Sequence, residues 1–254
     1  MPLLVVEHLS VHFGGVCALD GPSLTVEPGQ ICGLIGPNGA GKTTLFNCVS
    51  RVYRPRAGRI QYGEIDLLAT PPFAVAALGI ARTFQNLGLI PSLSIVENIL
   101  VGGHTQSRGG FFASALHLAH VRTAERALRV RAHEIMERLD LLDVADERAD
   151  AVPYGTMKRV ELARALMIAP TLLLLDEPAC GLNHSEINEL AGLVLGLRDE
   201  YGVGVLLVEH HVAMVMEISD KVVVLDLGRK VAEGSAAQVQ SDPAVIAAYL
   251  GGAA

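Results

Sequence analysis

The segment from Gly36 to Thr43 contains residue types that bind a chain of phosphates. Its sequence, Gly-Pro-Asn-Gly-Ala-Gly-Lys-Thr, fits a pattern of one glycine, any four residues, then Gly-Lys-Ser/Thr. Glycine lets backbone N–H groups turn towards an anion, Lys42 adds a full positive charge that we expect to serve catalysis, and the Thr43 hydroxyl can ligate Mg²⁺. The residues expected to hold the phosphates are Asn38, Gly39, Ala40, Gly41, Lys42, Thr43 and Thr44.

Two adjacent carboxylates, Asp176 and Glu177, follow a run of four leucines. A buried apolar strand that ends in an acid presents a carboxylate to the shell of a magnesium ion, and we assign that role to Asp176. Glu177 points differently and can polarise an attacking water as a general base. An Asp-Glu pair alone could equally be a solvated turn, but the phosphate-binding segment upstream favours the catalytic interpretation.

Two single residues gain meaning only in combination with these segments. Gln85 can reach a metal ion and the attacking water, although a lone glutamine is usually a surface group. His210 follows the apolar residues 203–208, where an imidazole can touch a γ-phosphate, although a lone histidine is more often structural. The other histidines lack the spacing of metal ligands, so we expect no metal site made by the protein alone.

The elements that position these residues are predicted to alternate between strands and helices. Residues 31–35 are typical of a buried strand, the glycine-rich loop follows, and a helix is predicted over residues 42–50. This order is the βα unit of an α/β fold. After Pro153 the alternation returns, with helices over residues 158–168 and 185–198 and strands at 172–175, 203–208 and 222–225.

The middle of the chain has a different pattern. Apolar residues at alternating spacings of four and three predict one long helix over residues 122–142. Arginines on its other face indicate a solvated surface rather than a patch for nucleic acid or lipid. The sequence therefore predicts an α/β core interrupted by a mostly helical insert.

Composition narrows the class of protein. Hydrophobic residues make up 50% of the 254 residues and aromatic residues only 4%, which is typical of helices packed on a parallel sheet. The net charge of −7 argues against general affinity for nucleic acid, and four scattered cysteines favour reduced thiols in the cytosol. The start does not resemble a secretion signal, and the apolar residues 165–175 are too few to span a bilayer. We therefore expect any contact with a membrane to go through a partner.

The order of these motifs resembles the ATPase subunits of ABC transporters, over essentially the whole chain. In that family an adenine-stacking aromatic residue is followed by Walker A, the Q-loop, the signature, Walker B, the D-loop and a switch histidine. The matching positions are Phe13, residues 36–43, Gln85, residues 152–156, residues 172–176 with Glu177, residues 180–183, and His210. The segments most similar to the type that serves branched-chain amino acid uptake are residues 153–164, 177–183 and 242–251, with the glycine-rich insert near 102–112.

The resemblance implies a single ABC ATPase domain: an α/β fold with a P-loop, RecA-like core and parallel sheet, an N-terminal antiparallel β subdomain and a helical insert. It implies a nucleotide-binding core from residues 1–86 and 159–235, a helical subdomain with the signature at 87–158, and a helical tail at 236–254. The implied activity is hydrolysis of ATP with Mg²⁺, coupled to transport. The implied partners are a second ABC ATPase subunit, transmembrane permease subunits and, indirectly, an extracytoplasmic solute-binding protein. The permease would hold the chain at the cytoplasmic face of the cell membrane.

The chain departs from the family pattern in three motifs. Residues 152–156 read Val-Pro-Tyr-Gly-Thr where Leu-Ser-Gly-Gly-Gln is usual, so Pro153 replaces the serine expected to touch a partner's γ-phosphate. Asn183 replaces the D-loop aspartate, and His211 the aspartate after the switch histidine. The residues still expected to contact a partner's nucleotide are Tyr154, Gly155 and Thr156, with Thr156 at a helix N-cap. We therefore expect a non-identical second subunit and two unequal sites.

Other functions remain open at this point. Branched-chain amino acids are the solute favoured by the resemblance, and urea or short amides come second. A soluble ABC ATPase acting on ribosomes or in DNA repair usually has two cassettes or a long coiled-coil insertion, and this chain shows neither. A small-molecule kinase would give no reason for Gln85, the signature-like residues 152–156 and Glu177 to occur together.

Overall fold

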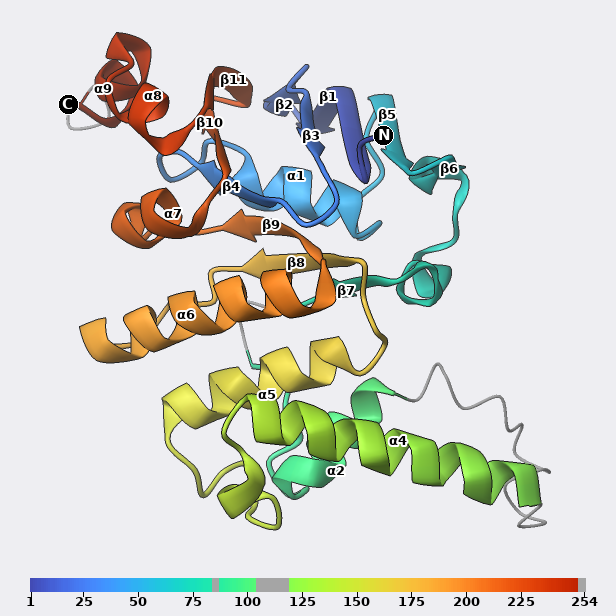
Figure 1. Cartoon of the computed structure of the whole chain (residues 1–254). Helices are drawn as coiled ribbons and strands as arrows, with labels where there is room; N and C mark the ends of the chain where they lie inside the picture. Colours follow the sequence, from blue (N-terminus) through green and yellow to red (C-terminus); the bar gives the residue numbers. More distant parts are fainter. Residues whose placement is uncertain (84–86, 104–118, 251–254) are drawn as a thin grey trace.

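The computed structural model of the chain describes residues 1–83, 87–103 and 119–250. Its centre is a six-stranded sheet with the strand order β11-β10-β4-β9-β8-β7 (Figure 1). The neighbouring strands from β10 to β7 pair in parallel, and β11 pairs antiparallel with β10. The strands are β4 (Ile31–Ile35), β7 (Ile80–Arg82), β8 (Leu172–Asp176), β9 (Gly204–Val208), β10 (Lys221–Asp226) and β11 (Arg229–Gly234).

Both faces of this sheet are covered at its centre, which explains why β4, β8 and β9 are continuous apolar runs. Successive side chains of a strand point to opposite faces, so β4, β7, β8, β9 and β10 each contribute to two cores. In β8, Leu173 and Leu175 belong to the core on the helical side, while Leu172 and Leu174 belong to the core on the other side. All five residues of β8 are buried, Asp176 among them.

The second core lies against an antiparallel sheet from the N-terminal part of the chain, as the resemblance implied. Its strands are β1 (Leu4–Phe13), β2 (Val16–Asp20), β3 (Leu24–Val26), β5 (Ala57–Tyr62) and β6 (Ile65–Asp66). Helix α1 (Lys42–Val49) contributes Leu45 and Phe46 to this core, together with Leu4 and Ile60 of the antiparallel sheet. The helix that carries Lys42 is therefore fixed by apolar contacts along its length.

The helical insert lies at the end of the molecule farthest from the antiparallel sheet (Figure 1). It includes α2 (Ile95–Gly102), α4 (Ala119–Arg138) and α5 (Tyr154–Leu166). The predicted stripe on α4 is buried at Ala132 and Ile135, and the helix ends at Arg138, four residues earlier than predicted. The remaining helices are α6 (His184–Tyr201), α7 (Val212–Ile218), α8 (Ala236–Gln240) and α9 (Pro243–Leu250), with 3-10 turns η1 (Leu67–Ala69), η2 (Pro72–Ala74), η3 (Ala76–Leu78) and η5 (Leu142–Val144).

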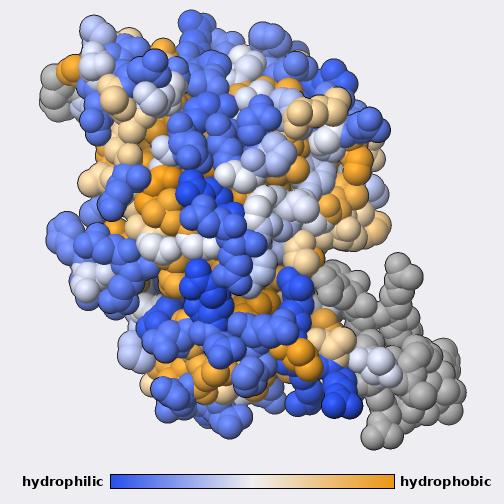
Figure 2. All heavy atoms as spheres, in the orientation of Figure 1, coloured by the Kyte–Doolittle hydropathy of each residue, from blue (hydrophilic) through white to orange (hydrophobic). Residues whose placement is uncertain are grey.

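The surface in this orientation is mostly hydrophilic, with hydrophobic residues in smaller patches between hydrophilic ones (Figure 2). Among the described residues, no helix is both long enough and apolar enough to cross a bilayer.

Candidate functional site

The phosphate-binding segment lies between the end of β4 and the start of α1, as predicted. Gly36 (φ 149°) and Gly41 (φ 98°) have backbone conformations that L side chains rarely adopt. A Cβ at Gly36 would lie 2.0 Å from the carbonyl oxygen of Leu225, so only glycine fits there. No side chain caps the start of α1, which leaves its first N–H groups and the positive end of the helix dipole available to an anion.

Lys42 is held inside this loop. Its ammonium donates hydrogen bonds to the carbonyl oxygens of Gly36 at 2.7 Å and Pro37 at 2.9 Å, and the residue is only 5% exposed. Burial lowers the pKa of Lys42, while the nearby charge of Glu177 opposes that shift. The loop thus keeps a cation at its centre through main-chain acceptors, next to the helix start.

A cavity of about 470 Å³ opens over the loop. Residues from four separate parts of the chain line it: Val16, Cys17, Ala18, Asn38, Gly39, Ala40, Gly41, Lys42, Thr43, Thr44, Glu177 and His210. The structure therefore brings the predicted base and the predicted switch histidine to the phosphate-binding loop. Neither Cys17 nor its neighbours were expected to line the site, because nothing in the sequence shows that β2 crosses beside the loop.

Glu177 and His210 form a pair at the edge of this cavity. His210 Nε2 lies 2.9 Å from Glu177 Oε1, and Glu177 is 8% exposed. Glu177 has a left-handed backbone (φ 48°), held by a hydrogen bond from its N–H to the carbonyl of Val208. A non-glycine residue in this conformation stores strain, and such residues gather at functional sites. Asp176 ends strand β8, whereas Glu177 lies directly after it with this left-handed backbone.

Asp176 is 2% exposed at the end of β8, and the two oxygens of its carboxylate have different surroundings. Oδ2 accepts a hydrogen bond from Arg82 at 2.8 Å, and Arg82 also donates to Asn47 and Ser50 near the end of α1. Burial raises the pKa of Asp176, and Arg82 opposes that shift. The sequence analysis assigned no role to Arg82, because its partners lie 32 to 94 residues away along the chain.

The donor set fits a magnesium ion. Asp176 Oδ1 is buried and has no hydrogen-bond partner among the described residues, and Thr43 offers a hydroxyl on the first turn of α1. Mg²⁺ prefers such oxygen donors and is held in ATPases by one or two protein ligands together with the phosphates. No group of three His, Cys, Asp or Glu side chains suited to a metal occurs in the described parts of the chain.

Phe13, the predicted adenine-stacking residue, is not among the residues that line this cavity. Phe13 ends β1 and is 47% exposed, with its ring edge-on to Tyr53 at a centroid distance of 5.2 Å. It is paired across the hairpin with Val16, which does line the cavity. Gln85 lies outside the described residues.

The signature residues 152–156 do not reach the cavity over the phosphate-binding loop. Helix α5 begins at Tyr154 with Pro153 as its N-cap, so the expectation of Thr156 as N-cap was wrong. Proline fits this position because the N-cap φ of −57° lies within the range to which its ring restricts the backbone. Pro153, Gly155 and Thr156 line a different cavity of about 280 Å³ between α5 and α6.

Asn183 has a structural role, as a helix cap, that was not predicted from the sequence. It is the N-cap of α6, where its side chain accepts the N–H of Glu186 and the Glu186 carboxylate accepts the N–H of Asn183. An aspartate could make the same cap, so this departure leaves the local structure intact.

Comparison with known proteins agrees with this geometry. Residues 19–180 match the family model described as ABC transporter, and residues 229–254 match one described as branched-chain amino acid ATP-binding cassette transporter. The chain is 41% identical to the high-affinity branched-chain amino acid transport ATP-binding protein BraF of Pseudomonas aeruginosa, over 98% of both chains. It is 40% identical to the corresponding protein LivG of Escherichia coli, again over 98% of both chains.

Solved structures agree in fold. The ADP conformation of an ATP-binding cassette of an ABC transporter has a TM-score of 0.86 and 31% identity, covering 99% of both chains. A nucleotide-free cassette of an ABC transporter has a TM-score of 0.84 and 30% identity, covering 98% of this chain and 99% of the other. This chain therefore belongs to the ABC transporter family, as an ATP-hydrolysing cassette.

Proposed function

We propose that this chain is the ATPase subunit of an importer that takes up branched-chain amino acids. The observation that supports ATP hydrolysis best is the Glu177–His210 pair, 2.9 Å apart at the edge of the cavity over the phosphate-binding loop. The solute is inferred from the match of residues 229–254 and from the two relatives above, whose names give branched-chain amino acid transport.

Each proposed role follows from the position of the side chain. Lys42 and the N–H groups at the start of α1 bind the β- and γ-phosphates. Glu177 accepts a proton from water as the water oxygen bonds to the γ-phosphorus and the bond to the ADP oxygen breaks. His210 holds the Glu177 carboxylate in place and faces the γ-phosphate. Mg²⁺, with Thr43, Asp176 and Gln85 as its proposed ligands, would neutralise the phosphate oxygens.

Glu177→Gln tests the proposed base. The amide has the same shape and can still accept a hydrogen bond from His210, so ATP affinity measured by calorimetry should be unchanged. Phosphate release should fall by about 100-fold or more, the scale of losing a general base. Glu217→Gln, at an exposed position on α7, is the matched control and should hydrolyse ATP normally. Normal turnover of a folded Glu177→Gln protein would remove Glu177 from this role.

The solute requires the whole transporter. We expect the chain, reconstituted in vesicles with the permease and solute-binding proteins encoded beside it, to drive ATP-dependent uptake of leucine, isoleucine or valine. Urea should not be taken up. Uptake of urea and not of leucine would move this chain to the second solute class while leaving its ATPase role intact.

The second ATPase subunit is proposed to be non-identical. Residues 152–156 of this chain lie outside its own nucleotide cavity, and Pro153 offers neither a hydroxyl nor an N–H to a partner's phosphate. We expect the chain alone to be largely monomeric with ATP and slow in turnover, and to be accelerated by a different cassette. Light scattering of Glu177→Gln with ATP tests this, beside a variant that also carries Pro153→Ser and Tyr154→Gly and should self-associate more strongly. A tight ATP-dependent homodimer of the unmodified chain with fast turnover would contradict the unequal pair.

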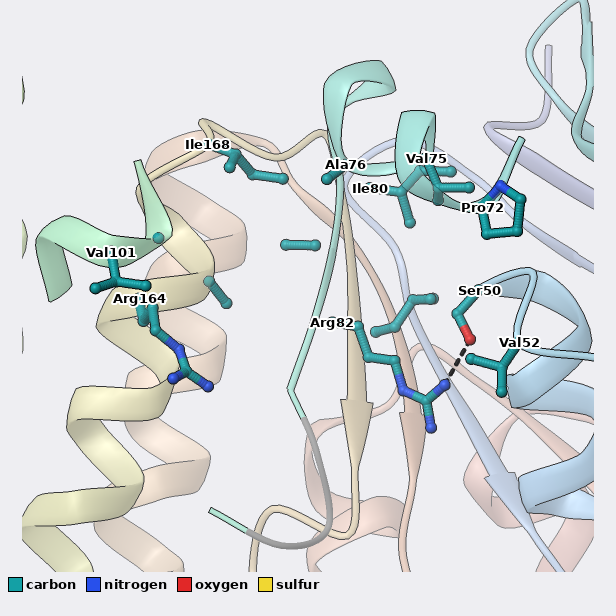
Figure 3. Close-up of a pocket in the computed structure, with 14 residues that line it drawn as sticks. Ser50, Val52, Pro72, Val75, Ala76, Ile80, Arg82, Val101, Arg164 and Ile168 are labelled. Atoms are coloured by element: carbon teal, nitrogen blue, oxygen red, sulfur yellow. Dashed lines mark hydrogen bonds between the residues drawn. The ribbon is translucent and has the colours of Figure 1, made fainter. Parts of the chain in front are cut away.

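The permease is proposed to contact an apolar groove of about 370 Å³ between the core and residues 87–158, taken as the helical subdomain (Figure 3). Val52 and Val101 face it from opposite walls and are 59% and 42% exposed, which suits an apolar segment of a membrane partner. This contact would hold the chain at the cytoplasmic face of the membrane.

A charge in this groove tests the contact. Val101→Asp should leave the ATPase rate of the free subunit unchanged but abolish its stimulation by permease vesicles. Ile246→Asp, at a similarly exposed apolar residue on α9, should keep the stimulation. Equal stimulation of the Val101 variant would place the permease elsewhere.

A further inference from the structure

Glu209 is a buried carboxylate that none of the roles above uses. It follows β9 directly, is 3% exposed, and does not line the nucleotide cavity. Its Oε1 accepts the N–H of Ala179 at 2.6 Å, and its Oε2 accepts the N–H groups of His210 at 2.8 Å and His211 at 3.0 Å. Hydrogen bonds from neutral donors to a carboxylate are short and strong, and these three satisfy a charge that burial would otherwise penalise.

The three N–H groups belong to two different loops. Ala179 lies in the connection from β8 to α6, two residues after Glu177, whereas His210 and His211 lie in the connection from β9 to α7. One carboxylate therefore joins the loop of the proposed base to the loop of the proposed switch histidine. Each oxygen of Glu209 serves one of the two loops.

The geometry of the Glu177–His210 pair depends on where these loops lie relative to each other. Glu177 has a strained backbone, and such a conformation persists only where the surroundings over-determine it. Its N–H is held by Val208, its carboxylate lies against His210, and the peptide two residues later is held by Glu209. Without Glu209, the His210 loop and the Ala179 turn would lose their common anchor.

We propose that Glu209 is a positioning residue for ATP hydrolysis, which sets the separation of Glu177 and His210 by binding the backbone on both sides of the pair. The inference rests on the proposed roles of Glu177 and His210. It leads to a separate expectation, namely that Glu209 controls the turnover of ATP without contacting the nucleotide. Binding of ATP should not depend on it, because Lys42 and the glycine-rich loop are held by contacts in which Glu209 has no part.

Glu209→Gln is the sharpest variant, because it changes one oxygen to an amide and keeps the shape. A glutamine has one acceptor, so it can serve the Ala179 side or the histidine side, and its NH₂ group then faces an N–H of the other loop. We expect kcat to fall about 10- to 100-fold, the scale of a displacement of up to an ångström at a catalytic group, with KM for ATP unchanged. Glu209→Asp keeps the charge but is one methylene shorter, and it should also lower kcat alone.

Asp220→Asn is the matched control. Asp220 accepts the N–H of Ile31 at 2.8 Å, so it too is a carboxylate that binds the backbone. It lies where the parallel strands β4 and β10 begin, whereas Glu209 lies where β9 ends. The Asp220→Asn variant should lower the melting temperature without a selective effect on kcat. Glu209→Gln should instead show a selective loss of kcat, with a melting temperature lowered no more than in the control.

Two further measurements separate positioning from general stabilisation. Hydrogen exchange should show faster exchange at the amides of Ala179 or of His210 and His211 in Glu209→Gln, and unchanged exchange at the glycine-rich loop. In a Glu177→Gln background, adding Glu209→Gln should cause no further loss of turnover, because the group it positions is already gone.

The outcomes are distinguishable. Full activity of folded Glu209→Gln and Glu209→Asp would overturn the inference, and so would a loss that multiplies fully with that of Glu177→Gln. If Glu209→Gln does not fold, Glu209→Asp decides, and normal kcat in that variant would overturn the inference as well. Normal turnover in Glu177→Gln would instead overturn the proposed base itself, whatever Glu209 does.

Discussion

Removing the ring of Phe13 tests the adenine platform that the family resemblance implies. In the structure this ring is half exposed at the end of β1, with its other side edge-on to Tyr53. The hairpin partner Val16 is 67% exposed and lines the nucleotide cavity, so an adenine held over Val16 would lie beside the free face of Phe13. We therefore expect Phe13→Ala to weaken ATP binding.

The size of this effect follows from the exposure of the ring. Alanine substitution of an aromatic residue stacked on a base costs about 1–3 kcal/mol. Because about half of the Phe13 ring is already covered, only its 47% exposed surface is available, and the lower part of this range, about 1–1.5 kcal/mol, applies. This corresponds to about a 5- to 13-fold higher Kd for ATP. Loss of the contact with Tyr53 should cost about 0.5–1.5 kcal/mol of stability, which leaves the protein folded.

Calorimetry with two ligands isolates the contribution of the adenine ring to binding. ATP should bind Phe13→Ala more weakly, whereas tripolyphosphate, which has no adenine, should bind it as tightly as the unmodified protein. Phe73→Ala, at an 86% exposed phenylalanine outside the cavity, should change neither affinity. Unchanged ATP affinity would rule out Phe13 as the platform, and an equal loss for both ligands would mean that the ring acts through the phosphate-binding loop.

The remaining predictions concern the loop, the metal ligand and the thiols. Lys42→Met should reduce ATP affinity by about 100-fold or more, the scale of a lost charge-assisted contact, measured by calorimetry. Burial lowers the folded-state pKa of Lys42 below its unfolded value of 10.5, so the unfolded chain binds more protons between the two values and stability rises with pH in that window. Urea titrations at several pH values should show that the free energy of unfolding rises less steeply with pH in Lys42→Met than in the unmodified protein. An identical rise in the two proteins would refute the buried ammonium. Asp176→Asn should raise the Mg²⁺ concentration needed for half-maximal ATP hydrolysis, and an unchanged requirement would exclude it as a ligand. Burial raises the pKa of Cys32 to about 12 and of Cys48 to about 11, so at pH 8 fewer than about one in a thousand is a thiolate. Iodoacetamide should spare both and label the exposed Cys17. ATP should slow the labelling of Cys17, because this residue lines the cavity. Mass spectrometry of the labelled peptides is the measurement, and labelling of Cys32 or Cys48 in preference to Cys17, or labelling of Cys17 that ATP does not slow, would contradict this prediction.

The sequence predicts the parts of this fold that depend on near neighbours. The strand at residues 31–35 matches β4, and the helix start at Lys42 matches α1, because a buried apolar run, a glycine-rich loop and a helix follow each other directly. Helix α5 was predicted to begin at residue 158, four residues late, because Tyr154 and Gly155 do not suggest a first turn. Pro153 was the available signal, since proline is common at helix starts.

Contacts between distant segments account for what the sequence could not predict. Arg82 reaches Asp176 only because β7 and β8 pair in parallel, and Glu209 reaches Ala179 only because β8 and β9 pair. The partners in these two pairs are 94 and 30 residues apart. Strands β5 and β6 were also missed, because the short polar stretches at residues 57–62 and 65–66 become strands through pairing with β1 and with each other.

Because Glu177 has a left-handed backbone, the residue that would make position 177 most stable to heat is not the residue that ATP hydrolysis needs there. A non-glycine residue there costs about 1–2 kcal/mol, and glycine or asparagine adopts the same conformation more readily. A laboratory selection that retains the most heat-stable variants would therefore enrich glycine or asparagine at position 177, and those variants would have no base. Directed evolution of this cassette for robustness needs an activity screen in every round, because the inactive substitution is among the easiest stabilising ones to find.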